Sequence, residues 1–326
     1  MRAAYIERLG PAEEIRCGPL PDPVPGPTDV LVEVTATTVN PVDTFVRSGL
    51  FPTPLPMPFV VGRDLVGTVL STNGRVTGFA PGDVVWCDSL GHAGRQGAAA
   101  ERAVVPMERL YRVPPGVQPR AAVAAVFPAG TAYLALFTHG RLRAGDTVIV
   151  EGAAGHVGAA LVAFAVDAGA RVVATAAADD AAYCTALGAD EVVDYRAADR
   201  LERLAAACPG GAALYLDTSG RNDLAAALDL LAFRGRIVVL AGAASRPVLP
   251  VTALYMHDRT VSGFVISHAT VAELAEAAVA TNRMLTAGKL RPRATVDLPL
   301  SATAEAHAMI ERGELRGRRI IITPGD

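Results

Sequence analysis

The sequence predicts an α/β protein with a doubly wound, six-stranded parallel sheet and a second, β-rich domain. In the middle of the chain, apolar strand segments alternate with alanine-rich helical stretches. A glycine-rich turn joins the first of these strands directly to a helix. The first 118 residues, by contrast, are dense in short strand and turn signals. Together these observations predict one domain of alternating strands and helices beside one of irregular β structure.

Six strand segments define the predicted sheet. Helical stretches such as 158–168, 180–187 and 223–231 separate them. Strands that alternate with helices form a parallel sheet covered on both faces, and six of them match the doubly wound dinucleotide-binding fold. The segments are 147–151, 171–175, 191–194, 213–217, 236–240 and 260–266.

The flanking regions are expected to form the second domain. Segments 30–35 and 64–70 are predicted strands, and the prolines spaced through 19–27 predict a polyproline-like strand. A helical run at 271–287 precedes further strand segments at 294–298 and 319–323. We expect this tail to rejoin the first domain. Residues 1–118 and 269–326 would then form one domain, and residues 119–268 the other.

Composition excludes several kinds of partner and location. The net charge of −3 provides no basic footprint for nucleic acid or anionic lipid. Residues 121–140 carry no charge and have the length of a bilayer span, but Pro128 and Gly130 interrupt them, so we expect a buried helix and turn instead. Four scattered cysteines and an N-terminus without an apolar signal region favour the cytoplasm.

The turn at 152–158 is expected to bind a dinucleotide. A pyrophosphate at the start of the following helix would meet free backbone N–H groups and the positive end of the helix dipole. Gly155 would allow that close approach, and Gly158 would let the helix pack on the strand. A merely tight turn in another α/β fold is the alternative. The predicted contacts are Gly152, Ala154, Gly155, His156, Val157 and Gly158.

The residues after the second strand favour NADP over NAD. NAD sites usually carry an acid there that binds the ribose hydroxyls, whereas residues 174–178 read Ala-Thr-Ala-Ala-Ala. No Arg or Lys follows nearby. Tyr195 and Arg196, after the third strand, could contact the 2′-phosphate, or they could belong to a surface turn. The predicted NADP site is completed by Thr175, Ser219, Ala241 and Gly242.

Several motifs occur in the order found in one known family. They are NPVDTFVRSG at 40–49, PFVVGRDLVG at 58–67, GDVV at 82–85, AGTAY at 129–133, AAGHVG at 153–158, LGAD at 187–190 and GRRIII at 317–322. The chain resembles the medium-chain dehydrogenase/reductase superfamily over essentially its whole length, and most closely the zinc-free quinone oxidoreductase (zeta-crystallin-like) branch.

The resemblance implies a GroES-like substrate domain and a Rossmann NADP-binding domain, with the nicotinamide held in a cleft between them. It also implies a homodimer formed through the edge strand of the Rossmann sheet, here residues 260–266. In this segment Phe264, Val265 and Ile266 are expected to lie near the nicotinamide as well.

The same resemblance argues against a metal. Zinc alcohol dehydrogenases of this superfamily bind the catalytic metal with a Cys and a Gly-His-Glu motif, where this chain has Asn40 and Gly62-Arg63-Asp64. Zinc needs three protein ligands and cannot use arginine. The closely spaced cysteines of a structural zinc lobe are also missing, and no two histidines have ligand spacing. We therefore expect no metal site.

Without zinc, the acceptor must take a hydride readily, as quinones and α,β-unsaturated carbonyls do. Asn40 and Asp43 are expected at the floor of the nicotinamide pocket as polar orienting groups, although capping of a helix is the alternative reading. Thr131 would lie beside the nicotinamide amide or ribose. These three are the predicted catalytic residues. The predicted walls of a flat, apolar acceptor site are Phe45, Phe51 and Tyr133.

Three functional hypotheses follow. The first is an NADPH:quinone oxidoreductase. Many quinone reductases of this branch have Tyr where this chain has Phe45 and Phe51, and the loss of a phenol removes a possible proton donor. The second hypothesis is therefore an enoyl or enone reductase acting on a biosynthetic intermediate. The third is a crystallin-like protein that binds NADPH without significant catalysis.

Overall fold

The computed structural model describes residues 1–325, which divide into two compact units. Unit 1 comprises Met1–Phe127 and the chain from Thr270 onward, and unit 2 comprises Pro128–Ala269. The boundary falls inside helix α2 (Pro119–Tyr133), whereas the expected domain boundary lay at the start of that helix.

Unit 2 is built on a parallel sheet of six strands in the order β11-β10-β9-β12-β13-β14. This confirms the predicted doubly wound sheet. Most of these strands are rich in β-branched residues, although β12 has none, and the central ones are buried, as parallel strands covered on both faces should be. The strands are β9 (Thr147–Glu151), β10 (Arg171–Ala176), β11 (Glu191–Asp194), β12 (Ala212–Asp217), β13 (Leu231–Val239) and β14 (Thr260–Gly263).

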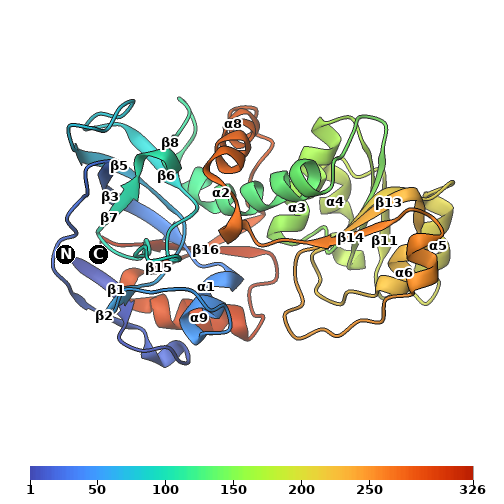
Figure 1. Cartoon of the computed structure of the whole chain (residues 1–326), viewed down its shortest axis with the longest axis horizontal. Coiled ribbons are helices and arrows are strands. Elements are labelled where there is room, and N and C mark those ends of the chain that lie inside the picture. The colour runs from blue at the N-terminus through green and yellow to red at the C-terminus, as the bar shows by residue number, and fades with distance from the viewer. Residues whose placement is uncertain (326) are drawn as a thin grey trace. The chain divides into compact units, whose positions relative to one another are not determined.

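Helices cover both faces of this sheet. In Figure 1, α3 and α4 lie on one side and α6 on the other. Leu204 of α5 and Leu228 of α6 pack with Ile149 and Val173 of the sheet in one buried core. The helices are α3 (His156–Asp167), α4 (Ala181–Ala186), α5 (Arg200–Ala207), α6 (Leu224–Asp229) and α7 (Val251–Tyr255).

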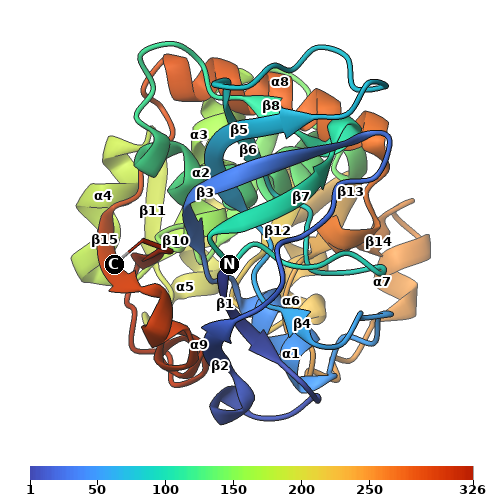
Figure 2. The ribbon, with the colours of Figure 1, turned by 90° about the vertical axis from the view of Figure 1, so that its left-hand side faces the viewer.

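Unit 1 is a β-rich domain with a mixed sheet of order β15-β16-β3-β5-β6-β8, to which β7 adds by pairing with β3. Figure 2 shows the long strand β3 crossing between β5 and β7. A smaller sheet has the order β2-β1-β4. The strands are β1 (Arg2–Ile6), β2 (Arg16–Pro19), β3 (Asp29–Thr38), β4 (Phe59–Val60), β5 (Leu65–Thr72), β6 (Val84–Cys87), β7 (Arg102–Pro106), β8 (Tyr111–Arg112), β15 (Ala294–Pro299) and β16 (Arg318–Thr323).

The C-terminal segment completes unit 1, because β16 pairs with both β15 and β3. The helices α1 (Pro41–Ser48) and α9 (Thr303–Glu311) lie beside β1 and β2 (Figure 2), and Arg47 of α1 pairs with Glu311 of α9. Helix α8 (Val271–Thr286) is anchored to the sheet by a hydrogen bond of 3.0 Å from the Trp86 indole N–H to Asn282.

The expected break at Pro128 and Gly130 was wrong. Helix α2 runs through both residues and continues as a π-helix, Leu134–His139. A proline in a helix costs about 3 kcal/mol, whereas each fully buried large apolar side chain contributes about 1.5–3 kcal/mol. Val126, Leu134 and their neighbours are fully buried and outweigh that cost. Pro119–His139 has the length and apolar composition of a membrane span, but 72% of its most apolar window is buried inside the structure.

Several other boundaries differ from expectation. Strand β13 begins at Leu231 instead of residue 236, and helix α6 ends at Asp229 instead of residue 231. The last strand ends at Gly263 instead of continuing to residue 266, and Ile266–His268 forms a 3₁₀ turn. Helix α3 begins at His156, so its first turn contains Gly158. All of these shifts occur at the ends of elements, which are their least predictable parts.

Candidate functional site

The predicted site residues divide between the two units. Asn40, Asp43, Phe45 and Phe51 belong to unit 1. Thr131, Tyr133 and all the predicted cofactor-binding residues belong to unit 2. Each set is therefore described within its own unit.

The glycine turn is held by the two strands beside β9. The hydroxyl of Thr175, at the end of β10, accepts a hydrogen bond from the Gly152 N–H at 3.3 Å, and the Thr175 carbonyl accepts one from the Ala153 N–H at 3.0 Å. On the other side, the Thr218 hydroxyl donates to the Glu151 carbonyl at 2.7 Å. Thr175, which was predicted to contact the cofactor, therefore stabilises the conformation of the glycine turn through two hydrogen bonds.

The turn presents an open helix N-terminus. Gly155 is the N-cap residue of α3 and is exposed, and no side chain caps the helix there. The first N–H groups of a helix have no partner within the helix, so an uncapped, exposed end is suited to an anion. A methyl group at Gly158 would lie 2.2 Å from the Gly152 carbonyl oxygen, so only glycine allows the helix to pack this closely on the turn. The turn fits a dinucleotide pyrophosphate.

The loops after β12 and β13 are joined to each other. The buried Asp217 carboxylate accepts hydrogen bonds from the N–H groups of Ser219 at 2.6 Å and Asn222 at 2.7 Å. The Asn222 amide donates in turn to the Ala241 carbonyl at 2.9 Å. Predicted contacts Ser219, Ala241 and the adjacent Gly242 are thus brought together at the carboxyl edge of the sheet.

Aromatic contacts hold two further predicted residues, Phe264 and Tyr133. Phe264 stacks on the ring of His139 with centroids 4.3 Å apart, and Tyr133 packs on Phe137 at 4.9 Å. Ile266 is buried, and Val265 is partly exposed. In unit 1, Phe51 packs against the core cluster that contains Phe59, while Phe45 on α1 is 36% exposed.

Asn40 and Asp43 form the start of α1. The Asp43 carboxylate accepts a hydrogen bond from the Asn40 N–H at 2.7 Å, which completes a capping arrangement with Asn40 as the N-cap. Both side chains are buried. The capping interpretation weighed from the sequence is therefore realised in the structure, whatever further role these residues have.

Arg319 is a residue of this site that the sequence did not reveal. It is 2% exposed, and its Nη2 atom donates to Asn40 Oδ1 at 2.7 Å and lies 3.2 Å from Asp64 Oδ2. The Asn40 amide also donates to Asp64 at 3.1 Å, and Thr38 donates to the same carboxylate. We call Thr38, Asn40, Asp64 and Arg319 the buried polar network.

Further buried charges surround this network. Arg63, fully buried, lies 3.7 Å from Asp43, and burial raises the pKa of Asp43 to about 6 against the opposing effect of Arg63. Burial also raises the pKa of Asp88 to about 7, with Asp64 adding to the effect. Both carboxyl groups consequently hold their protons to higher pH than exposed aspartates do.

The donor set of the network does not fit a catalytic zinc. Its nitrogen donors are the Asn40 amide and the Arg319 guanidinium, and the Asp64 oxygens are already used by Thr38, Asn40 and Arg319. A guanidinium 3.2 Å from that carboxylate occupies the place of a cation. No group of three or more His, Cys, Asp or Glu side chains in the described part of the chain, residues 1–325, has the arrangement of a metal site.

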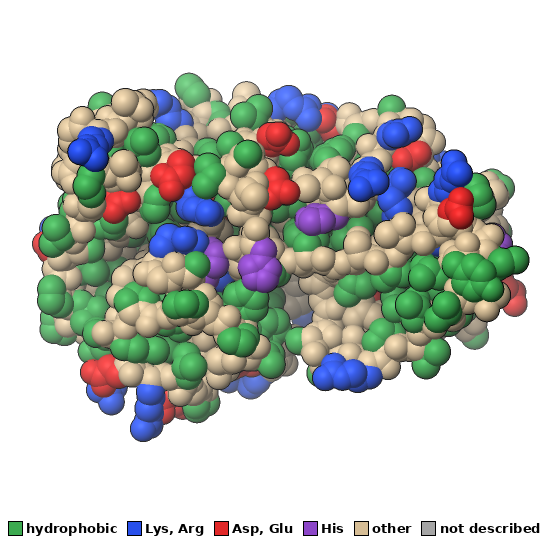
Figure 3. Space-filling model, in the orientation of Figure 1, with side chains coloured by type: hydrophobic (Ala, Val, Ile, Leu, Met, Phe, Trp, Pro, Cys, Tyr) green, Lys and Arg blue, Asp and Glu red, His purple; other side chains and the backbone are tan. Residues whose placement is uncertain are grey.

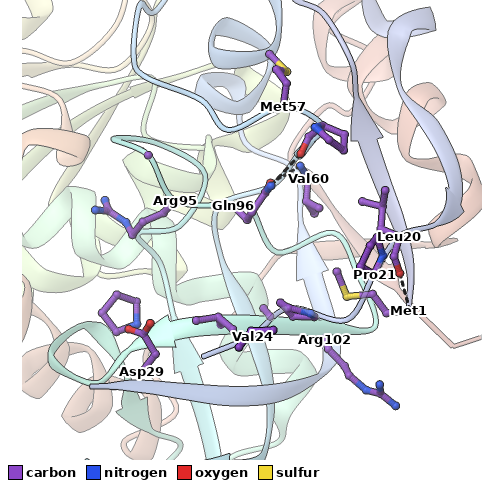
Figure 4. Close-up of a pocket in the computed structure, with 17 residues that line it drawn as sticks. Met1, Leu20, Pro21, Val24, Asp29, Met57, Val60, Arg95, Gln96 and Arg102 are labelled. Atoms are coloured by element: carbon purple, nitrogen blue, oxygen red, sulfur yellow. Dashed lines mark hydrogen bonds between the residues drawn. The ribbon is translucent and has the colours of Figure 1, made fainter. Parts of the chain in front are cut away.

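A separate pocket of about 460 Å³ lies on unit 1 (Figure 4). Its walls include Met1, Leu20, Val24 and Met57, and Gln96 crosses one side by donating to the Pro58 carbonyl at 2.8 Å. None of the predicted site residues lines it.

Two family models match the chain. They are the alcohol dehydrogenase GroES-like domain over residues 26–115 and the zinc-binding dehydrogenase over residues 157–280. The quinone oxidoreductase of Mus musculus is 28% identical over 99% of this chain and 97% of its own length.

Solved structures of dehydrogenases and oxidoreductases are similar to this chain over essentially its whole length. A structure of an NAD-dependent alcohol dehydrogenase is 30% identical, with a TM-score of 0.89 and 100% of both chains covered. A mycobacterial protein solved in complex with NADPH is 27% identical, with a TM-score of 0.84, covering 99% of this chain and 100% of that one. The chain belongs to the medium-chain dehydrogenase/reductase family. It is a quinone oxidoreductase-like enzyme, and its Rossmann domain binds a nicotinamide cofactor.

Proposed function

We propose that the enzyme transfers a hydride from NADPH to a quinone or another conjugated carbonyl compound without zinc. The observation that carries this proposal is the buried polar network. Where zinc-dependent relatives are expected to hold their metal, this chain pairs Asp64 with Arg319 and Asn40. The zinc-binding dehydrogenase match covers residues 157–280, so it includes none of these positions.

The glycine turn supports NADPH as the hydride donor, because its open helix N-terminus suits a pyrophosphate. The cofactor supplies the hydride, and the protein supplies binding and orientation. Residues 174–178 bear no acid that would repel a 2′-phosphate. The similarity to a protein complexed with NADPH supports this choice, and the similarity to an NAD-dependent enzyme makes it worth testing directly.

Asn40 and Asp43 would act as positioning residues in this reaction. Their polar atoms are used inside unit 1, where they fix the start of α1 and the buried polar network. Thr131 would contact the nicotinamide amide or ribose. Phe45, Phe51 and Tyr133 would supply the apolar walls against a flat acceptor, and solvent would supply the proton to the reduced product.

An enone or enoyl reductase is the second candidate. Phe45 is partly exposed on α1 and has no hydroxyl with which to hold or protonate an acceptor oxygen. Such a site would favour acceptors whose reduced form is stabilised without a protein donor. A protein that binds NADPH without significant catalysis is the third.

A panel of quinones and enones with NADPH distinguishes these candidates. We expect NADPH oxidation, followed by the loss of its absorbance, to depend on an added quinone. Reduction of enones but of no quinone would contradict the quinone assignment and support the second candidate. No acceptor-dependent oxidation at all would contradict both and support the third.

We also propose that two copies associate through β14. This strand is at the edge of its sheet, so one side of its backbone lacks a partner strand. Val251, Tyr255 and Met256, just before it, are each more than 60% exposed, as is Phe233. Hydrophobic side chains gather over this part of the surface at the right of Figure 3.

The cysteines bear on the location of the protein, which we propose to be the cytoplasm. All four cysteines are free thiols, as expected in a reducing compartment.

The dimer predicts a specific effect of a surface charge. Met256→Asp should shift the protein from dimer to monomer in sedimentation velocity, because a carboxylate would be buried in the interface. Val279→Asp, at another exposed position, on α8, serves as the control and should remain dimeric. A monomeric wild-type protein would refute the proposal.

A further inference from the structure

Two arginines share one tyrosine in unit 2. The Cζ atoms of Arg196 and Arg221 each lie 5.1 Å from the centroid of the Tyr195 ring. Tyr195 and Arg196 directly follow β11, whereas Arg221 lies in the loop after β12. The arrangement therefore places two positive charges beside one ring, although they follow separate strands.

The sheet order locates this ring. β10 and β9 lie between β11 and β12, and all four strands are parallel. Residues that follow parallel strands lie at the same edge of the sheet, so the contact from Tyr195 to Arg221 crosses the carboxyl ends of β10 and β9. The end of β10 is where NAD-specific sites place the acid that binds the ribose hydroxyls. The end of β9 leads into the glycine turn.

Both guanidinium groups are available to an anion. Arg196 and Arg221 are exposed, and neither forms an ion pair with a carboxylate in residues 1–325. Arg200, in the same region, is instead paired with Glu151 at 3.2 Å and Asp223 at 3.7 Å. The acid that ends β12, Asp217, is buried and occupied by the N–H groups of its own loop. Asp194 lies close by, because its carboxylate accepts a hydrogen bond from the Arg196 N–H at 2.9 Å. Burial raises the pKa of the Glu151 carboxyl, and Arg221 is near enough to oppose that rise. Neither acid forms an ion pair with the guanidinium of Arg196 or Arg221.

We propose that Arg221 and Arg196 bind the 2′-phosphate of NADPH and set the preference for NADPH over NADH. Both guanidinium groups pack on the same ring, so a phosphate at the edge of that ring could accept hydrogen bonds from both. Tyr195 supports both side chains through cation–π contacts. Residues 174–178 contain no basic side chain to bind a phosphate. Arg221, in the loop after β12, would supply that positive charge instead. This inference rests on the proposed use of NADPH.

The test measures binding of two small probes that carry no nicotinamide. Calorimetric titration compares adenosine 2′,5′-bisphosphate with 5′-AMP for the wild type, Arg221→Gln and Arg196→Gln. In each variant the affinity for the bisphosphate should fall by about tenfold or more, as expected for the loss of a charge-assisted contact. The affinity for 5′-AMP should be nearly unchanged. Arg112→Gln, which disrupts a similar stack on Phe79 at 5.3 Å in unit 1, is the matched control. Thermal unfolding checks that the variants remain folded.

The outcomes separate this inference from the function on which it rests. Wild-type preference for the bisphosphate, unaltered in Arg221→Gln and Arg196→Gln, would overturn the assignment of these residues and leave NADPH use intact. An equal loss for both probes would also overturn it, because the arginines would then bind the shared part of the adenylate. A wild-type protein that binds the two probes equally well would contradict both the use of NADPH and the assignment of Arg196 and Arg221 to its 2′-phosphate.

Discussion

Replacing Arg319 with methionine should lower the free energy of unfolding by about 3–5 kcal/mol, because it removes one partner of a buried ion pair. The variant keeps most of the aliphatic volume, but it leaves the fully buried Asp64 carboxylate without its nearest cation. Asn40 also loses the donor to its side-chain oxygen. Chemical denaturation at neutral pH measures the change.

Arg318→Met is the matched control for this measurement. Arg318 precedes Arg319 on β16, but it is exposed and bonds only to nearby backbone carbonyls of Glu314 and Leu315. Its replacement should change the free energy of unfolding by less than about 0.5 kcal/mol, as at most surface positions. Equal effects of the two substitutions would show that the buried polar network does not stabilise unit 1.

Alanine at Gly158 and at Gly155 should have different effects. The added methyl group at 158 meets the Gly152 carbonyl oxygen at 2.2 Å and the Ala153 Cα at 2.8 Å, both backbone atoms that cannot move independently. We expect Gly158→Ala to lower the free energy of unfolding by about 1–3 kcal/mol or more, the cost of overpacking, and to impair cofactor binding with it.

At Gly155 the nearest atom to the added methyl group is 3.3 Å away, and the backbone φ of −76° suits alanine. Gly155→Ala should therefore change the free energy of unfolding by less than about 1 kcal/mol. It should still lower the affinity for NADPH, because the methyl group lies where a pyrophosphate would approach. Fluorescence titration with NADPH measures this. Undiminished affinity in Gly155→Ala would contradict a pyrophosphate site at this helix end.

Local patterns in the sequence predicted the framework of the Rossmann unit. The strand at Thr147–Glu151, the glycine turn and the helix after it lie within one short stretch, so their residues carry enough information to recognise them. Helix α2 was harder to predict, because the decision at Pro128 depends on burial supplied by the rest of the fold. Propensity alone favoured a break there.

The contacts that define the candidate site are mostly distant in the chain. Arg319 and Asp64 are separated by 255 residues, and nothing in the strand pattern of β16 indicates that a charged side chain there is buried. Arg221 follows a strand three positions from Tyr195 in the sheet, so its contact with that ring depends on strand order. Sequence alone predicted Tyr195 and Arg196 as possible contacts of the 2′-phosphate, with a surface turn as the alternative, but did not indicate Arg221.

Zinc content measured together with activity tests the zinc-free mechanism most directly. The protein is dialysed against a strong chelator, its zinc is quantified by mass spectrometry, and NADPH oxidation with a quinone acceptor is then followed. Zinc-free protein with full acceptor-dependent oxidation is the predicted result. Stoichiometric zinc in the purified protein, with activity lost on chelation and restored by added zinc, would contradict it.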